Sequence, residues 1–246
     1  MSDKLKMESG SKIKHFGVWI KNTQFLQINR ENYAPIDKIS STWSPRIGQI
    51  RESYYKTVAE REEDYDDEEC RIYSDSWCEE HRKRCLKNFD TNMAFFQILE
   101  QENFGKILSE LLIINKDIYE VFDLNSCKGV SGIYIMVLDK YKQMYIGQAS
   151  DIKRRILKHW STQKPFDRLI FGGVDNSVLS IDSFGALDTT RIYILETLSL
   201  DWSEKKIVNY VPSIYRLNRI GGGKPTDVFN FVDALDKMNH RELTSK

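Results

Sequence analysis

The pattern of hydrophobic and polar residues predicts a first half of mixed character. Residues 15–37 contain two strand-like runs around polar residues 22–24, which predicts a β-hairpin. Residues 40–48 are typical of a loop. From about residue 49 to residue 124, apolar residues recur at helical spacing, in segments near 54–58, 92–101 and 106–115. The first half is therefore expected to be mostly helical after its hairpin.

The second half alternates strand and helix patterns. Residues 131–138 and 144–147 are apolar runs joined by the polar turn 139–143, and residues 191–197 form a third run. One helix is expected over 151–160 with Ser150 as its N-cap, and another over 202–211. An amphipathic helix is expected over 226–240, after a glycine hinge at 219–225. The pattern predicts an α+β fold.

The charge balance changes where the strand pattern begins. Residues 1–125 carry 18 Lys and Arg against 23 Asp and Glu, and residues 126–246 carry 18 against 13, although the whole chain is neutral. We therefore expect an N-terminal recognition or regulatory region over 1–125 and a second domain over 126–246. The acidic run at 60–69 is interpreted as a solvated helix face or loop. An autoinhibitory patch that mimics nucleic acid, or a second cation site, are the alternatives.

Composition places the chain among cytoplasmic proteins without a membrane partner. No segment approaches the roughly 18 apolar residues that a membrane span needs, and the first residues lack the apolar run of a signal peptide. Four cysteines are too few for a disulfide framework in a chain of 246 residues. Cys70, Cys78, His81 and Cys85 lack the paired spacing of structural zinc sites, so buried thiols are favoured over zinc.

One carboxylate falls within an apolar stripe. On the predicted helix 202–211, Glu204 shares a face with Ile207, Val208 and Val211. Because burying a carboxylate without a partner is costly, Glu204 needs an arginine, hydrogen-bond donors or a metal ion. A salt bridge at the rim of the core is the alternative. Glu196 is a competing carboxylate, but it ends a strand.

The predicted helix 151–160 carries a basic pair at the edge of its apolar stripe. Arg155 and His159 are one turn apart, whereas Lys153, Arg154 and Lys158 point to solvent. The pair suits a phosphate contact and a proton shuttle. Two amphipathic side chains lying over apolar neighbours would show the same pattern.

Two tyrosines stand beside glycines in the predicted strands. Tyr134 shares a strand face with Gly132, and Tyr145 shares one with Gly147. A glycine inside a strand usually marks a close approach or a bend. Tyrosine itself is common in strands, so the pattern alone leaves its role open.

These residues occur in a fixed order. GIY (132–134) is followed after ten residues by YIG (145–147), then by Arg155 and His159 in YIGQASDIKRRILKH, and later by EKKIVNYVPSIYRLNRIGG. Over about residues 129–223 the chain closely resembles the GIY-YIG nuclease superfamily. The resemblance implies an α+β fold with a small three-stranded antiparallel sheet flanked by helices. It also implies metal-dependent hydrolysis of phosphodiester bonds.

The resemblance assigns a role to each matching residue. The glutamate matching Glu204 binds one divalent cation, so Mg²⁺ or Mn²⁺ is the expected cofactor. The arginine matching Arg155 contacts the scissile phosphate. The tyrosines matching Tyr134 and Tyr145 position or deprotonate the attacking water, and which of them is the base stays open. An unperturbed tyrosine has a pKa near 10, so it needs help from a cation.

The remaining candidates surround this set. The resemblance implies that His159 assists proton transfer and that Asn218 supports the substrate or the geometry of the site. Backbone near Gly147 is expected to approach the substrate. Basic side chains are expected to contact nucleic acid, although 161–188 is equally consistent with a plain surface loop; they are Lys153, Arg154, Lys158, Lys164 and Arg168.

The chain is therefore expected to be a divalent-metal-dependent endonuclease acting on DNA, with duplex favoured and RNA left open. Restriction or genome defence is the favoured role, because the nuclease-like region is C-terminal. A partner-controlled nuclease effector toxin and an inactive nucleic-acid-binding module are the alternatives. Residues 1–125 would recognise DNA or bind a regulatory protein. A homodimer would let a chain with one site cut both strands.

Overall fold

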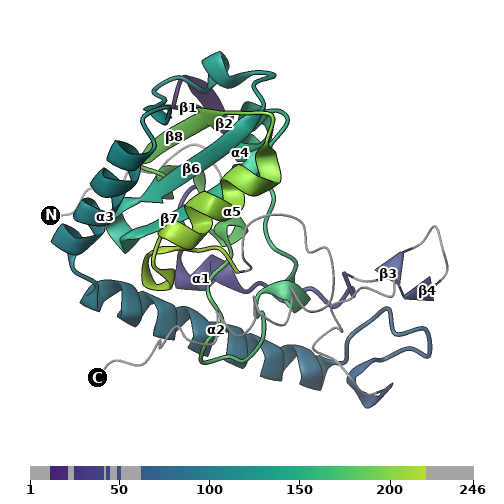
Figure 1. Ribbon diagram of the computed structural model, residues 1–246. Coiled ribbons are helices and arrows are strands. Elements are labelled where there is room, and N and C mark those ends of the chain that lie inside the picture. The colour runs from purple at the N-terminus through teal and green to yellow at the C-terminus, as the bar shows by residue number, and fades with distance from the viewer. Residues whose placement is uncertain (1–11, 22–24, 42, 45–48, 51–61, 220–246) are drawn as a thin grey trace, which may run out of the picture.

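A four-stranded antiparallel sheet lies in the upper part of the molecule in the view of Figure 1. The computed structural model describes residues 12–21, 25–41, 43, 44, 49, 50 and 62–219. The sheet order is β5–β8–β6–β7. Its strands are β5 (Tyr119–Glu120), β6 (Gly132–Leu138), β7 (Gln143–Ala149) and β8 (Arg191–Glu196). The α+β class and three of these strands are as predicted. The fourth strand, β5, was missed because two residues are too few to show alternation.

Both faces of this sheet are covered. The even-numbered residues of β6 from 134 to 138 join one hydrophobic cluster with α4 (Ile152–Ser161). Its odd-numbered residues from 133 to 137 join a second cluster with α3 (Gln101–Ile114) and α5 (Leu200–Tyr210). Every residue of β6 is therefore buried, and the strand forms one continuous apolar run.

The N-terminal hairpin is shorter than predicted and turns at a different place. Strands β1 (Lys12–His15) and β2 (Val18–Lys21) are joined by Phe16 and Gly17, whose φ angles are 42° and 73°. Positive φ at both central residues is the requirement of a type I′ turn, which usually contains Asn-Gly. Phenylalanine in the first position hid this turn from the sequence pattern. The predicted turn at 22–24 lies outside the described residues. The last four residues of the predicted second strand instead form α1 (Arg30–Tyr33).

One long helix dominates the first half. Helix α2 (Asp75–Ile98) begins at the N-cap Ser74 and lies along the lower side of the molecule in Figure 1. It ends before α3 begins, so the predicted helix over 92–101 is divided between the two. Short strands β3 (Trp43–Ser44) and β4 (Gln49–Ile50) pair with each other. Strand β3 lies in the predicted loop 40–48, and β4 lies at the start of the region that was predicted to be helical. The predicted segments at 54–58 and 226–240 lie outside the described residues.

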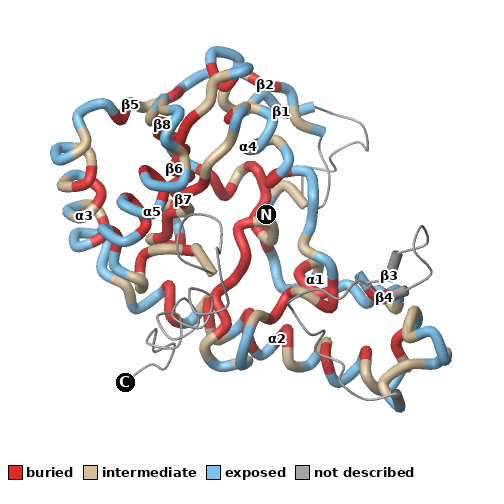
Figure 2. The backbone as a smooth tube through the Cα atoms, turned by 45° about the vertical axis from the view of Figure 1, so that its right-hand side comes forward, coloured by how far each residue is buried: buried red, intermediate tan, exposed pale blue. Residues whose placement is uncertain are grey.

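The two halves of the chain share a hydrophobic core. The cluster beneath α4 includes Val18, Tyr33 and Phe89 from the first half. Figure 2 shows buried backbone running from the sheet toward α2. Within the described part of the chain, no helix has the length and apolarity that crossing a membrane requires.

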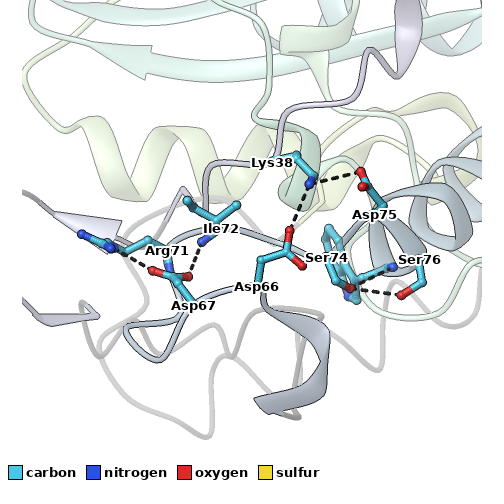
Figure 3. A network of polar contacts seen from close by, with 9 residues as sticks. Lys38, Asp66, Asp67, Arg71, Ile72, Ser74, Asp75 and Ser76 are labelled. Atoms are coloured by element: carbon cyan, nitrogen blue, oxygen red, sulfur yellow. Dashed lines mark hydrogen bonds and ion pairs between the residues drawn. The ribbon is translucent and has the colours of Figure 1, made fainter.

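Two carboxylates of the acidic run, Asp66 and Asp67, lie in the loop that precedes α2 in the chain (Figure 3). Lys38 Nζ lies 3.0 Å from Asp66 and 3.1 Å from Asp75. Asp67 pairs with Arg71 at 2.7 Å and also accepts a hydrogen bond from the backbone N–H of Arg71. These carboxylates therefore pair with cations of the same chain.

The connection between α4 and β8 is packed against α2. The side-chain amide of buried Asn88 donates to the carbonyls of Val174 and Ser177, at 2.7 and 2.8 Å. The carboxylate of Asp167 accepts from the hydroxyl of Tyr73 at 2.8 Å. These polar anchors fix a long irregular segment that the sequence pattern could not distinguish from a surface loop.

Candidate functional site

A pocket of about 250 Å³ lies at the β7 edge of the sheet. Its walls come from β7, α4, the connection before β8, α5 and residues 217–219. Half of the twelve candidate residues named from the sequence line it: Tyr145, Arg155, His159, Lys164, Glu204 and Asn218. Side chains from five separate segments therefore converge on one space.

Helix α4 supplies two of these side chains. Its N-cap is Asp151, whose side chain accepts from the N–H of Arg154 at 2.9 Å, rather than the predicted Ser150. Arg155 is exposed on the pocket wall, and His159 is buried one turn later. The apolar residues of the predicted stripe are buried and hold the helix against the sheet; they are Ile152, Ile156 and Trp160.

Tyr134 is fully buried and packs against Gly147. The two residues are paired across β6 and β7. A Cβ atom on Gly147 would lie only 2.3 Å from the Tyr134 hydroxyl oxygen. This glycine therefore makes room for the phenol of the neighbouring strand. Gly132 makes room for the backbone of β8 in the same way, because a Cβ atom added to it would lie 2.2 Å from the carbonyl oxygen of Leu195.

A chain of hydrogen bonds runs from Tyr134 to an aspartate that the sequence pattern did not reveal. The Tyr134 hydroxyl lies 2.8 Å from His159 Nε2, and His159 Nδ1 lies 2.5 Å from Asp182 Oδ1. An ionised carboxylate can only accept, so Nδ1 donates to Asp182. In the neutral imidazole Nε2 then accepts from Tyr134. The carboxylate thus fixes the tautomer of the histidine, as in hydrolytic triads.

The surroundings of Asp182 keep it ionised. Burial alone raises the pKa of this carboxyl group, but the hydrogen bond from His159 and the nearby charges of Lys164 and Arg155 outweigh burial. Its pKa therefore lies below the usual range of an aspartate.

Both tyrosines are protonated at neutral pH. Burial raises the pKa of Tyr134 well above its ordinary value and raises the pKa of Tyr145 to about 12. The charge of Arg155 opposes the rise in both, and a hydrogen bond with Tyr134 also opposes it in Tyr145. Each phenol can therefore accept a proton only while passing its own to another group.

The pocket carries more positive than negative charge. Arg155, Lys164 and Arg219 line it together with two carboxylates, Asp182 and Glu204. Burial lowers the pKa of Lys164, and the charge of Arg219 lowers it further. An anion in the pocket would relieve this repulsion between cations.

Arg219 was not a candidate from the sequence. Its guanidinium donates to the carbonyl oxygens of Val178, at 2.8 Å, of Arg168, at 3.0 Å, and of Leu169. It therefore holds the connection before β8 against the pocket while contributing a positive charge.

Glu204 is buried on α5 with its predicted apolar neighbours, Ile207, Val208 and Val211. Within the described residues, no group of three or more His, Cys, Asp and Glu side chains is arranged to hold a metal. Mg²⁺ is commonly bound by only one or two carboxylates, with water and substrate phosphate completing its shell. Glu204, with Asp182 lining the same pocket, provides a donor set of this kind.

Asn218 pairs with the backbone of β7. Its side-chain oxygen accepts from the N–H of Ile146 at 3.1 Å, and its side-chain nitrogen donates to the carbonyl of Ile146 at 2.7 Å. The N–H of Leu217 donates to the carbonyl of Met144 at 2.9 Å. Asn218 thus fixes the pocket wall to the edge strand.

The other basic candidates lie outside the pocket lining. Lys153 is half-buried, and Arg154 and Lys158 are exposed on α4. The guanidinium of Arg168 donates to the hydroxyl of Ser41 at 3.2 Å. Nucleic acid lying across α4 would meet the exposed pair, so these residues remain candidates for backbone contacts.

The cysteine-rich part of α2 is packed inside the core. Cys78 and Cys85 are buried, and burial raises the pKa of the Cys85 thiol to about 12. His81 Nε2 lies 2.9 Å from the carbonyl oxygen of Phe166. This contact makes Nε2 a donor to a backbone carbonyl.

Comparison of the chain with models of protein families, with curated proteins and with solved structures finds no match. The chemistry of the pocket is therefore the basis for assigning a function.

Proposed function

We propose that the chain is a divalent-metal-dependent endonuclease that hydrolyses phosphodiester bonds in DNA. The convergence of Tyr145, Arg155, His159 and Glu204 on one positively charged pocket carries this proposal. The motif order that resembles the GIY-YIG nuclease superfamily supports the same chemistry. The adjacent antiparallel strands β8, β6 and β7, flanked by helices, agree with the fold that the resemblance implies.

Arg155 and Lys164 would bind the scissile phosphate. A guanidinium can pair with two phosphate oxygens at once, which orients the phosphorus for attack. Both cations also stabilise the charge that develops on these oxygens in the transition state. Glu204 would hold Mg²⁺ or Mn²⁺, which when bound polarises the phosphate and neutralises part of its charge.

The proton of the attacking water leaves through the two tyrosines. His159 Nε2 is occupied by the Tyr134 hydroxyl, so a proton reaches it through that hydroxyl. Tyr145 accepts the proton of the water while passing its own to Tyr134, and Tyr134 passes its own to Nε2. The imidazolium that forms is stabilised by Asp182. In this relay His159 is the final base, and neither phenol has to be ionised beforehand.

The same proposal includes duplex DNA as the substrate and restriction or genome defence as the biological role. It also assigns recognition to residues 1–125 and takes a homodimer as the form that cuts both strands. The pairing of Asp66 and Asp67 with Lys38 and Arg71 favours this role over a toxin held by its acidic run. Those carboxylates are already engaged within the chain.

Plasmid cleavage by the full chain tests the proposal. We expect cutting with Mg²⁺ and none after chelation of the metal. Discrete fragments would support site recognition, whereas a smear would favour a non-specific effector. If no nucleic acid, DNA or RNA, is cut with either Mg²⁺ or Mn²⁺, the proposed activity is wrong.

A further inference from the structure

A second cavity, of about 390 Å³, adjoins the candidate pocket. The two cavities share His159 and Asp182, and this hydrogen-bonded pair forms the wall between them. The other walls of the second cavity come from β2, residues 25–28, α1, the end of α4 and residues 161–163. The first half of the chain therefore builds a space directly beside the residues to which we assign chemistry.

The lining of this second cavity is aromatic and amide-rich. Trp19 is 67% exposed on β2, and Phe25 and Phe184 line the same space. Gln27 and Gln163 are exposed, and their side-chain amides make no hydrogen bond to the residues that the structure describes. The described lining also includes Lys21, whereas three cations, Arg155, Lys164 and Arg219, line the candidate pocket, so the two cavities suit different parts of a ligand.

We propose that the second cavity binds a nucleobase of the substrate, next to the scissile phosphate. An aromatic ring stacks on the flat face of any base. An amide side chain offers a donor and an acceptor to the edge of a base. A single sugar joins the base and the phosphate of one nucleotide, so two cavities with a common wall match one nucleotide. This inference rests on the proposed function.

Nucleoside binding tests the inference without any cleavage. Each of the four deoxynucleosides is titrated into the full chain without divalent metal, and tryptophan fluorescence is followed, since Trp19 and Trp160 line the cavity. We expect saturable quenching by at least one nucleoside and none by deoxyribose 5-phosphate. The double variant Gln27→Ala/Gln163→Ala should bind that nucleoside about 10-fold more weakly, which corresponds to about 1.4 kcal/mol.

A matched variant and a second readout separate the possible failures. Asn209→Ala changes an exposed amide on α5 and should bind the nucleoside like the native chain. Unchanged melting temperatures would show that each variant is folded. In cleavage of oligonucleotides with randomised flanks, the double variant should lose base preference beside the cut.

The outcomes distinguish this inference from the proposed function. Absence of nucleoside binding, or binding unchanged in the double variant, overturns the nucleobase site even if the chain cuts DNA. Nucleoside binding that the double variant loses supports the site. If the native chain then cuts no nucleic acid, only the proposed activity fails.

Discussion

At the scale of single residues, the position of one proton decides whether His159 can act as a base. Nε2 is free to accept only while Nδ1–H points at Asp182. Asp182→Asn preserves the shape but can present an N–H to the ring, which favours the other tautomer. We expect this variant to cleave about 10²–10⁴-fold more slowly in single turnover, with DNA affinity nearly unchanged. A rate equal to that of the native chain would contradict the relay.

The same variant has a second readout in stability. Because the pKa of Asp182 is lowered in the folded chain, its ionised form stabilises the fold above the unfolded pKa of about 3.9. This contribution is lost as the pH falls through the lower folded value. The stability lost in Asp182→Asn should therefore be largest at neutral pH and shrink in acid. Urea denaturation of the native chain and of the variant, at neutral pH and in acid, measures this difference in the free energy of unfolding. An equal difference under the two conditions would contradict the lowered pKa.

Gly147 provides a steric test. A Cβ at this position would overlap the Tyr134 hydroxyl, so Gly147→Ala should displace the phenol and destabilise the fold by about 1–3 kcal/mol. Cleavage should fall as well. Gly105→Ala is the matched control, because its Cβ meets nothing within 4 Å in α3 and alanine favours a helix by about 0.5–1 kcal/mol. Thermal melting measures the stability of both variants. A similar change in melting temperature in Gly147→Ala and Gly105→Ala would refute the packing argument.

At the scale of elements, residues 216–218 hold the pocket wall against β7. Asn218→Ala removes two hydrogen bonds to Ile146, which should cost about 1–3 kcal/mol. Cleavage should also fall, because Glu204 and Arg219 lose a fixed neighbour. Asn209→Ala on the exposed face of α5 should do neither. Chemical denaturation measures the stability of the two variants, and a cleavage assay measures their activity. If Asn218→Ala is as stable as the native chain, other contacts hold the segment.

Elements whose pattern is local could be predicted from the sequence. Short apolar runs predicted β6, β7 and β8, and apolar stripes predicted α4 and α5. The connection before β8 could not be predicted, because its order depends on Asn88 and Arg219, which lie far away in the chain. Asp182 belongs to that connection, and for this reason it was not among the site residues predicted from the sequence. The hairpin turn was missed because Phe16 occupies a position that usually contains asparagine.

At the scale of the whole molecule, the two predicted regions share one core. Val18, Tyr33 and Phe89 pack in the same cluster as Tyr134 and Ile156. We therefore expect the full chain to unfold in a single transition when followed by both fluorescence and circular dichroism. A fragment of residues 126–246 should not fold alone. Two separate transitions, or a folded fragment, would contradict a shared core.

Glu204 gives the most direct test of the central claim that the pocket cuts phosphodiester bonds. The measurement is single-turnover cleavage of supercoiled plasmid in Mg²⁺ by the native chain, by Glu204→Gln and by Glu196→Gln. Glu196 is exposed at the end of β8 and serves as the matched carboxylate. We expect Glu204→Gln to cut at least about 10²–10³-fold more slowly and Glu196→Gln to cut like the native chain. Equal cutting by Glu204→Gln and the native chain would contradict the account.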